Sequence, residues 1–254
     1  MKFFRKLRKN TIENKAVRKY LLYGVGEILL VMIGILMALQ VNNWNEARKS
    51  KKEEQAILVQ LQNEFRENQS KLKRIYKIHD EVNRSLRALI SAMGPKPQPL
   101  PPDSLSLYMQ ELSHIPFYKP LTGSVTSLLS TGKIGLISND SLRLSISNWP
   151  RLLEDYRYTS GILYDMYNTE ILPYLTENYR FRNIGINTGL GSTGKSAFDL
   201  NSRDLLSDPV LENLAEIKRV DAEVLQKRAG ELLEIQESIL MLIRRELNSR
   251  IIAR

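Results

Sequence analysis

Apolar residues follow two contrasting patterns in the first hundred positions. Residues 20–41 form a continuous apolar run in which Glu27 is the single charged residue. Because a helix rises about 1.5 Å per residue, this run is long enough to cross the roughly 30 Å hydrocarbon core of a bilayer. The pattern therefore predicts one transmembrane helix.

Beyond this run, apolar side chains recur at alternating spacings of three and four residues. The series is Leu58, Leu61, Phe65, Asn68, Leu72, Ile75, His79, Val82, Leu86, Leu89 and Met93. Such spacing is typical of one face of a long helix. Neither proline nor glycine occurs between Gly34 and Gly94, so we expect the transmembrane helix to continue into this heptad helix. The stripe fits either a coiled-coil seam between two copies or one helix of a bundle within a single chain.

Two polar residues interrupt the stripe. An asparagine in a seam, here Asn68, can fix the register and the number of partners. A single histidine on an apolar stripe, here His79, is more typical of a hydrogen-bonded core residue than of a ligand or a pH switch.

The middle of the chain alternates breakers with short helical patterns. Residues 95–102 hold five prolines and predict a stiff, extended connector. Short helices are expected after it, and a long helical stretch then runs from Asn139 or Asp140 to about Leu172. The expected boundaries are a cap at Asp103, short helices ending at Leu112 and covering Thr122 to Ser130, a turn at 133–137 and a break or restart at Pro150.

The last part of the chain predicts a loop and one long helix. Residues 177–208 are rich in Asn, Gly and Ser and show no period, which is typical of an irregular loop. The final helix is expected from about Pro209 to Asn248. It is long enough to pack antiparallel on 58–93, with an apolar face made of Leu214, Ile217, Leu225, Leu232, Ile235, Ile239 and Leu242.

These patterns predict an all-α protein. Its parts are a basic cytoplasmic tail (1–19), a transmembrane helix (20–41), a long juxtamembrane helix (42–94), the Pro-rich connector (95–102) and the helical remainder of an elongated bundle (103–254).

The distribution of charge predicts where these parts lie. The net charge is +9, but residues 1–19 hold eight basic residues and one acidic residue, while 42–254 carry only +3. A nearly neutral domain argues against nucleic-acid binding, and a basic flank favours a cytoplasmic N-terminus. Only four basic residues follow the span, between Arg48 and Lys52, against eight before it. The bias therefore favours a periplasmic domain held in the inner membrane. No A-x-A-like site ends the run, which indicates an uncleaved anchor.

One face of the predicted span suits contact with another helix. Glu27, Gly34 and Ala38 share this face, and Gly34 and Ala38 form a small-xxx-small pair. In one interpretation the span self-associates or docks on a membrane protein, with Glu27 protonated or paired at the contact. In the other, Glu27 lies near the inner interface and snorkels or is protonated.

Catalytic and metal-binding patterns are scarce. The chain has no cysteine and two histidines, which leaves little material for a metal cluster or a His-based triad. Residues 189–196 match the P-loop pattern G-x-x-x-x-G-K-[ST] through Gly189, Gly194, Lys195 and Ser196. That chemistry needs a buried strand before the loop and a helix after it. The flanking residues suit neither, so we interpret the match as fortuitous and predict no catalytic residue, metal or cofactor.

The N-terminal block resembles a known family. FFRKLRKN followed by KYLLYGVGEILLVMIGILMALQVNNWNE, and more loosely STGKIGLISNDSLRLSISNW, are similar to segments of DUF6090, uncharacterised single-pass membrane proteins of Bacteroidota. The resemblance implies a helical membrane protein and brings no known activity.

The sequence thus favours a non-enzymatic, single-pass inner-membrane protein whose extracytoplasmic helical domain has an interaction, sensory or scaffold role. Its expected partners are the lipid bilayer and either a second copy or another membrane protein, through the transmembrane and heptad helices. The alternative is a membrane-tethered nucleotide-binding enzyme that uses the 189–196 loop.

Overall fold

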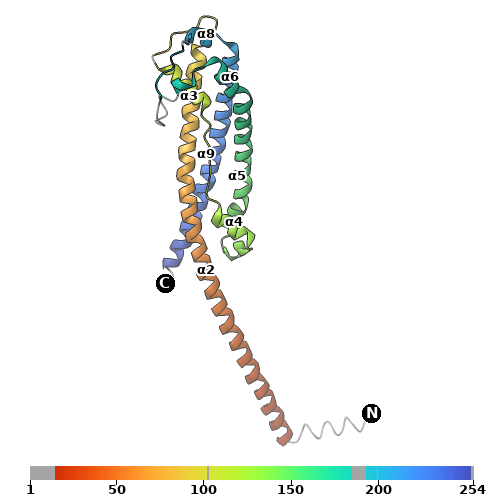
Figure 1. Cartoon of the computed structure of the whole chain (residues 1–254). Helices are drawn as coiled ribbons and strands as arrows, with labels where there is room; N and C mark the ends of the chain where they lie inside the picture. Colours follow the sequence, from red (N-terminus) through yellow and green to blue (C-terminus); the bar gives the residue numbers. More distant parts are fainter. Residues whose placement is uncertain (1–14, 102, 185–192, 199, 253–254) are drawn as a thin grey trace, which may run out of the picture. The chain divides into compact units, whose positions relative to one another are not determined.

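Every regular element in the described part of the chain is a helix, which confirms the all-α class. The structure, a computed structural model, describes residues 15–101, 103–184, 193–198 and 200–252 (Figure 1). The chain divides into two compact units, Met1–Ala56 and Ile57–Arg254. Each unit is described by itself.

The first unit contains the apolar run. Helix α2 (Lys15–Ala92) begins here and, as predicted, carries both the apolar run and the heptad stripe in one element. It is long and apolar enough to cross a membrane, and none of residues 20–41 is buried. The prediction of a basic tail falls mostly on residues 1–14, which lie outside the described residues.

In the second unit, α2 and α5 (Asp140–Met166) pack side by side in the same direction (Figure 1). Phe65 on α2 meets Trp149 on α5 edge-on, with ring centroids 5.3 Å apart. Further along both helices, His79 Nε2 and the Tyr156 hydroxyl form a 3.1 Å hydrogen bond. Since both contacts advance together along the two sequences, the helices are parallel.

Helix α9 (Pro209–Ile252) runs antiparallel to α2, as predicted. Gln226 Nε2 donates to Asp80 Oδ1 at 3.2 Å. Tyr76 lies one turn before Asp80 on α2, and Gly230 lies one turn after Gln226 on α9. A Cβ added to Gly230 would lie 3.6 Å from the Tyr76 ring, so the two helices run in opposite directions. The chain enters α9 through Asp208, whose Oδ1 accepts the Val210 N–H at 2.8 Å.

The heptad stripe is buried within one chain. All of its positions from Leu58 to Leu89 are at most 8% exposed, and the last, Met93, follows the end of α2 and is partly buried. This observation favours the bundle alternative over a seam between copies.

Short elements close the two ends of the bundle. One core cluster, around Phe65 and Trp149, also takes residues from α4 (Gly123–Ser130) and is flanked by the 3₁₀ turn η1 (Lys133–Leu136). The other, around Leu86 and Leu112, takes residues from α3 (Ser104–Ser113), α6 (Leu172–Asn178) and α8 (Ser202–Leu206).

An extended segment, residues 114–122, connects α3 to α4 and runs along the bundle. Alternate residues face inward: Pro116 and Tyr118 are buried, whereas Phe117 and Lys119 are exposed. This period of two is that of an extended chain. We call residues 114–122 the interior segment.

The prolines in the long helical stretch act differently from expectation. Pro150 does not break or restart the helix: it lies inside α5, and its ring is exposed. The regular α-helix is interrupted later, at the π-helical turn η2 (Tyr167–Ile171). This turn directly precedes α6, which has Pro173 in its first turn.

Two further expectations need correction. Asp103 takes the N-cap position of α3, but its backbone is left-handed (φ 63°) and its side chain makes no cap hydrogen bond. The 177–208 segment is not wholly irregular, since it holds the end of α6 and the short helices α7 (Phe181–Ile184) and α8. Asn201 begins α8 by accepting the Arg203 N–H.

The expected apolar face of α9 is buried or partly buried at every position except Ile217, which is 49% exposed. Beside the expected residues, Ala215, Ala222 and Ala229 are buried at seven-residue spacing. Small side chains at these positions let neighbouring helices approach closely.

Truncating a stripe residue should destabilise the bundle strongly. Leu72 is fully buried, so Leu72→Ala should cost about 2–5 kcal/mol through lost apolar burial and the cavity left behind. Urea unfolding of the full chain in detergent, followed by circular dichroism, measures this loss. Val59 lies 44% exposed on the same helix, and Val59→Ala should stay within about 0.5 kcal/mol. Equal effects of the two changes would contradict the packing described.

Candidate functional site

The interior segment has neither helix nor strand partners, so side chains supply hydrogen bonds to its backbone. The clearest case is Asn68 on α2. Its Nδ2 donates to the Leu121 carbonyl and its Oδ1 accepts the Leu121 N–H, both at 2.7 Å. The asparagine therefore fixes the register of the interior segment on α2, a role within one chain rather than between copies.

Glu64, one turn before Asn68, anchors the helix that follows the interior segment. This side chain is 8% exposed, and its Oε2 accepts the Ser124 N–H at 2.6 Å, while Oε1 accepts the Val125 N–H at 3.4 Å. These N–H groups belong to the first turn of α4 and have no partner within the helix. The carboxylate also complements the positive end of the helix dipole.

Lys218 on α9 holds the other end of the interior segment. Its side chain is 1% exposed, and its Nζ donates to the His114 carbonyl, directly after α3, at 2.9 Å. A cation is favoured at a helix C-terminus by the helix dipole. Burial nevertheless lowers the pKa of Lys218 to about 8, against the opposing effect of Asp221 and Glu111.

A second polar group crosses the core between Lys218 and Asn68. His79 is 1% exposed. Burial, then the positive charge of Lys218 and the effect of His114, together lower its pKa to about 4. Its partner Tyr156 packs edge-on against Tyr118, with ring centroids 5.9 Å apart. Burial raises the pKa of both tyrosines.

Tyr118 completes this group from the interior segment. Its hydroxyl accepts Gln236 Nε2 from α9 at 2.9 Å and donates to the Asn68 carbonyl at 3.4 Å. We call Asn68, His79, Tyr118, Tyr156, Lys218 and Gln236 the interior polar group. Its hydrogen bonds join α2, α5, α9 and the interior segment.

The interior polar group has proton carriers, and its side chains are buried. All six side chains are less than 9% exposed, and none of them lines the pocket beside the Pro-rich connector. The hydrogen bonds of the group hold the interior segment and the helices in register. The prediction that the chain has no catalytic residue, cofactor or metal site stays a prediction.

The helix-contact candidates lie where the sequence places them. Glu27, Gly34 and Ala38 are exposed on α2, and their spacing of seven and four sets them on one face of a helix. A Cβ added to Gly34 would meet no other atom within 4 Å. The face is therefore free for contact with another helix.

The P-loop-like segment is described only in part. Gly189 lies outside the described residues. Lys195 Nζ is 3.4 Å from Asp103 Oδ1 in an exposed ion pair, and the Ser196 N–H donates to Asn183 Oδ1 at 3.0 Å. The nearest described elements are helices α7 and α8, so no described strand leads into the loop. Our interpretation of the match as fortuitous stays a prediction.

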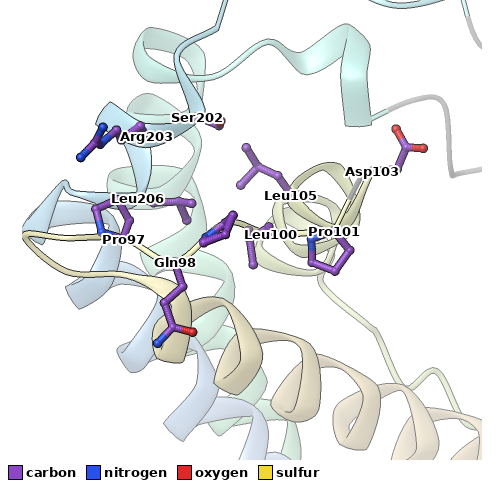
Figure 2. Close-up of a pocket in the computed structure, with 10 residues that line it drawn as sticks. Pro97, Gln98, Leu100, Pro101, Asp103, Leu105, Ser202, Arg203 and Leu206 are labelled. Atoms are coloured by element: carbon purple, nitrogen blue, oxygen red, sulfur yellow. The ribbon is translucent and has the colours of Figure 1, made fainter.

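A pocket of about 470 Å³ lies beside the Pro-rich connector (Figure 2). Leu100, Leu105 and Leu206 supply its apolar walls, and Arg203 and Asp103 lie at its rim. In Figure 2 the charged ends of Arg203 and Asp103 point away from each other instead of converging.

Sequence reasoning missed Glu64, Lys218 and Gln236. Each interrupts an otherwise apolar helix face, and in the sequence alone such residues look like ordinary solvated positions. The available signal was that Lys218 and Gln236 share the face marked by Ala215, Ala222 and Ala229.

Comparison with known proteins identifies the family but no activity. The model of a family described as "Family of unknown function (DUF6090)" matches residues 27–222, well over half of the chain, so the chain belongs to that family. No curated protein and no solved structure matches it.

The buried lysine should make stability depend on pH. Unfolded lysine keeps its proton up to about pH 10.4, whereas folded Lys218 loses it near 8. The unfolded state therefore binds more protons in this window, and stability should rise with pH, by a total on the order of 2–3 kcal/mol. Urea unfolding of the full chain between pH 8 and about 9.5, below the usual ionisation of tyrosine, measures the slope.

Two variants show whether Lys218 causes that slope. Lys218→Met removes the titrating group and should flatten it. Lys227→Met removes an exposed lysine of the same helix and should leave it unchanged. An unaltered slope in Lys218→Met would refute the assignment.

Proposed function

We propose that this member of the DUF6090 family is a single-pass protein of the cytoplasmic membrane that presents its helical domain outside the cytoplasm and acts through protein contacts rather than catalysis. The observation that carries the proposal is the segment 20–41, which is helical, apolar and unburied along its whole length. In water, so much exposed apolar surface would be strongly unfavourable, and a bilayer removes it from water.

The charge pattern supports the orientation. Eight basic residues precede the span, while the four that follow it lie between Arg48 and Lys52. Lys and Arg are retained on the cytoplasmic side of bacterial membranes. The second unit would then fold outside the cytoplasm, where a domain without cysteine gains no disulfides and depends on its own core.

The contacts are best made by the span itself. The heptad stripe is already covered within one chain, whereas the face of Glu27, Gly34 and Ala38 is open. Small residues let two helix backbones approach closely, and a protonated carboxyl can donate a hydrogen bond across the contact. A second copy is the simplest partner, since it presents the same face.

Self-association of the span can be measured directly. Full-length chains labelled with donor and acceptor dyes and mixed in liposomes should show energy transfer that falls on dilution with lipid. Gly34→Leu should abolish it because the added side chain separates the backbones. Glu27→Gln should retain it, because an amide can still donate a hydrogen bond, and Glu27→Ala should weaken it about fivefold or more, equal to roughly 1 kcal/mol.

The matched control changes the opposite side of the same helix. Leu36 lies half a turn from Glu27 by helix periodicity, and Leu36→Ala should leave the transfer unchanged. Transfer that is absent from the original chain, or equal in all variants, would show that this face makes no contact between copies.

A further inference from the structure

Directly after the apolar run, α2 separates its charges onto opposite faces. With about 100° between successive residues of a helix, Arg48 and Lys52 lie within about 80° of Trp44 on one side of α2. Glu46 and Glu53 lie about 160–180° from Trp44, on the opposite side. All five residues are exposed. We call Trp44, Arg48 and Lys52 the Trp44 face, and this face is basic because the two carboxylates point away from it.

The cations of the Trp44 face have no anionic partner. The guanidinium carbon of Arg48 lies 5.9 Å from the centroid of the Trp44 ring, which is a cation–π contact. Within the described part of the chain, neither Arg48 nor Lys52 forms an ion pair. The remaining carboxylate of this stretch, on Glu54, is 2% exposed. The face is therefore open to an anion from outside the chain.

The position of the Trp44 face relative to the bilayer rests on the proposed function, in which residues 20–41 cross the membrane. Trp44 then lies about 4.5 Å beyond the span by helix rise, at the level of the lipid headgroups, where tryptophan is enriched. Helix side chains lean toward the N-terminus of their helix. Arg48 and Lys52 therefore lean back toward Trp44 and the membrane surface.

Apolar side chains continue the same face into the span. They lie within about 60° of Trp44 by helix periodicity and are 50–65% exposed: Ile33, Met37 and Val41. The face thus has an apolar part inside the bilayer and a basic part at its surface, with the amphipathic indole ring between them.

We propose that the Trp44 face binds a phospholipid with an anionic headgroup. The guanidinium of Arg48 can donate two parallel hydrogen bonds to a phosphate, and Lys52 adds a second positive charge. The acyl chains of the same lipid lie along Met37 and Val41. A soluble anion uses only the basic part of the face, whereas an anionic lipid uses both parts.

Fluorescence quenching by brominated lipids tests this proposal, because bromine quenches tryptophan only at short range. The full chain is reconstituted in two sets of liposomes with equal parts of phosphatidylglycerol, which is anionic, and phosphatidylcholine, which is zwitterionic. Bromine is carried by the acyl chains of only one lipid in each set, so the surface charge is the same in both. Phosphatidylglycerol should be enriched beside Trp44 about fivefold or more, the effect of roughly one basic residue at a membrane surface.

Three variants assign the signal. Trp44→Phe leaves only the other tryptophan, Trp149, which is 1% exposed in the core, and supplies the background. Arg48→Gln should remove most of the enrichment. Lys49→Gln makes the same change of charge at the next residue, which is exposed but lies about 140° from Trp44, and it should retain the enrichment.

The possible failures are distinguishable. Equal quenching by the two lipids would overturn the lipid site and leave the membrane span standing. Quenching by neither lipid would contradict the span itself, and with it the proposed function. Equal losses in Arg48→Gln and Lys49→Gln would show bulk attraction between charges instead of a binding face. Loss of the enrichment on addition of inorganic phosphate would indicate a site for free phosphate, and either of these last two results would overturn the proposal.

Discussion

A chain segment that packs on the core without helix or strand must have the hydrogen bonds of its buried backbone groups supplied from elsewhere, and this constraint shapes the bundle. The interior segment runs between the long helices, and each unmet buried backbone group would cost about 1–3 kcal/mol. Asn68 hydrogen-bonds to the backbone of Leu121, and Lys218 donates to the His114 carbonyl. Glu64 accepts a backbone N–H from the first turn of α4, the helix that follows. The polar residues in otherwise apolar faces are thus explained by the backbone that they serve.

The side chains that hydrogen-bond to the interior segment place charged and polar groups in the core. Lys218 is buried, and burial of His79 together with the positive charge of Lys218 lowers the pKa of that histidine. Removing one partner would leave the other unmatched in a medium of low dielectric constant. The gain is specificity: the interior polar group links three helices and the interior segment in one register, which apolar contacts alone would fix less strictly.

The sequence was sufficient where one period dominated. It predicted the apolar run, the heptad stripe and the antiparallel α9, because burial alone sets those patterns. It failed where a residue's role depends on a distant segment. In the sequence Lys218 looks solvated, but in the fold it is buried against the interior segment. Pro150 lies inside α5 without breaking it, and Ile217 is exposed although it shares the apolar period of α9. The exposed face that contains Glu27 could be predicted from the sequence, because the periodicity of a single helix determines it.

The central claim, that residues 20–41 cross the membrane once and separate the N-terminus from the helical domain, can be tested by cysteine labelling. The chain has no cysteine, so a single introduced one reports a single site. Ser147→Cys, exposed on α5, should react with a membrane-impermeant maleimide on intact spheroplasts. Asn10→Cys should react only after the membrane is permeabilised. Equal labelling of both sites in intact spheroplasts, or labelling of Asn10→Cys alone, would contradict the account.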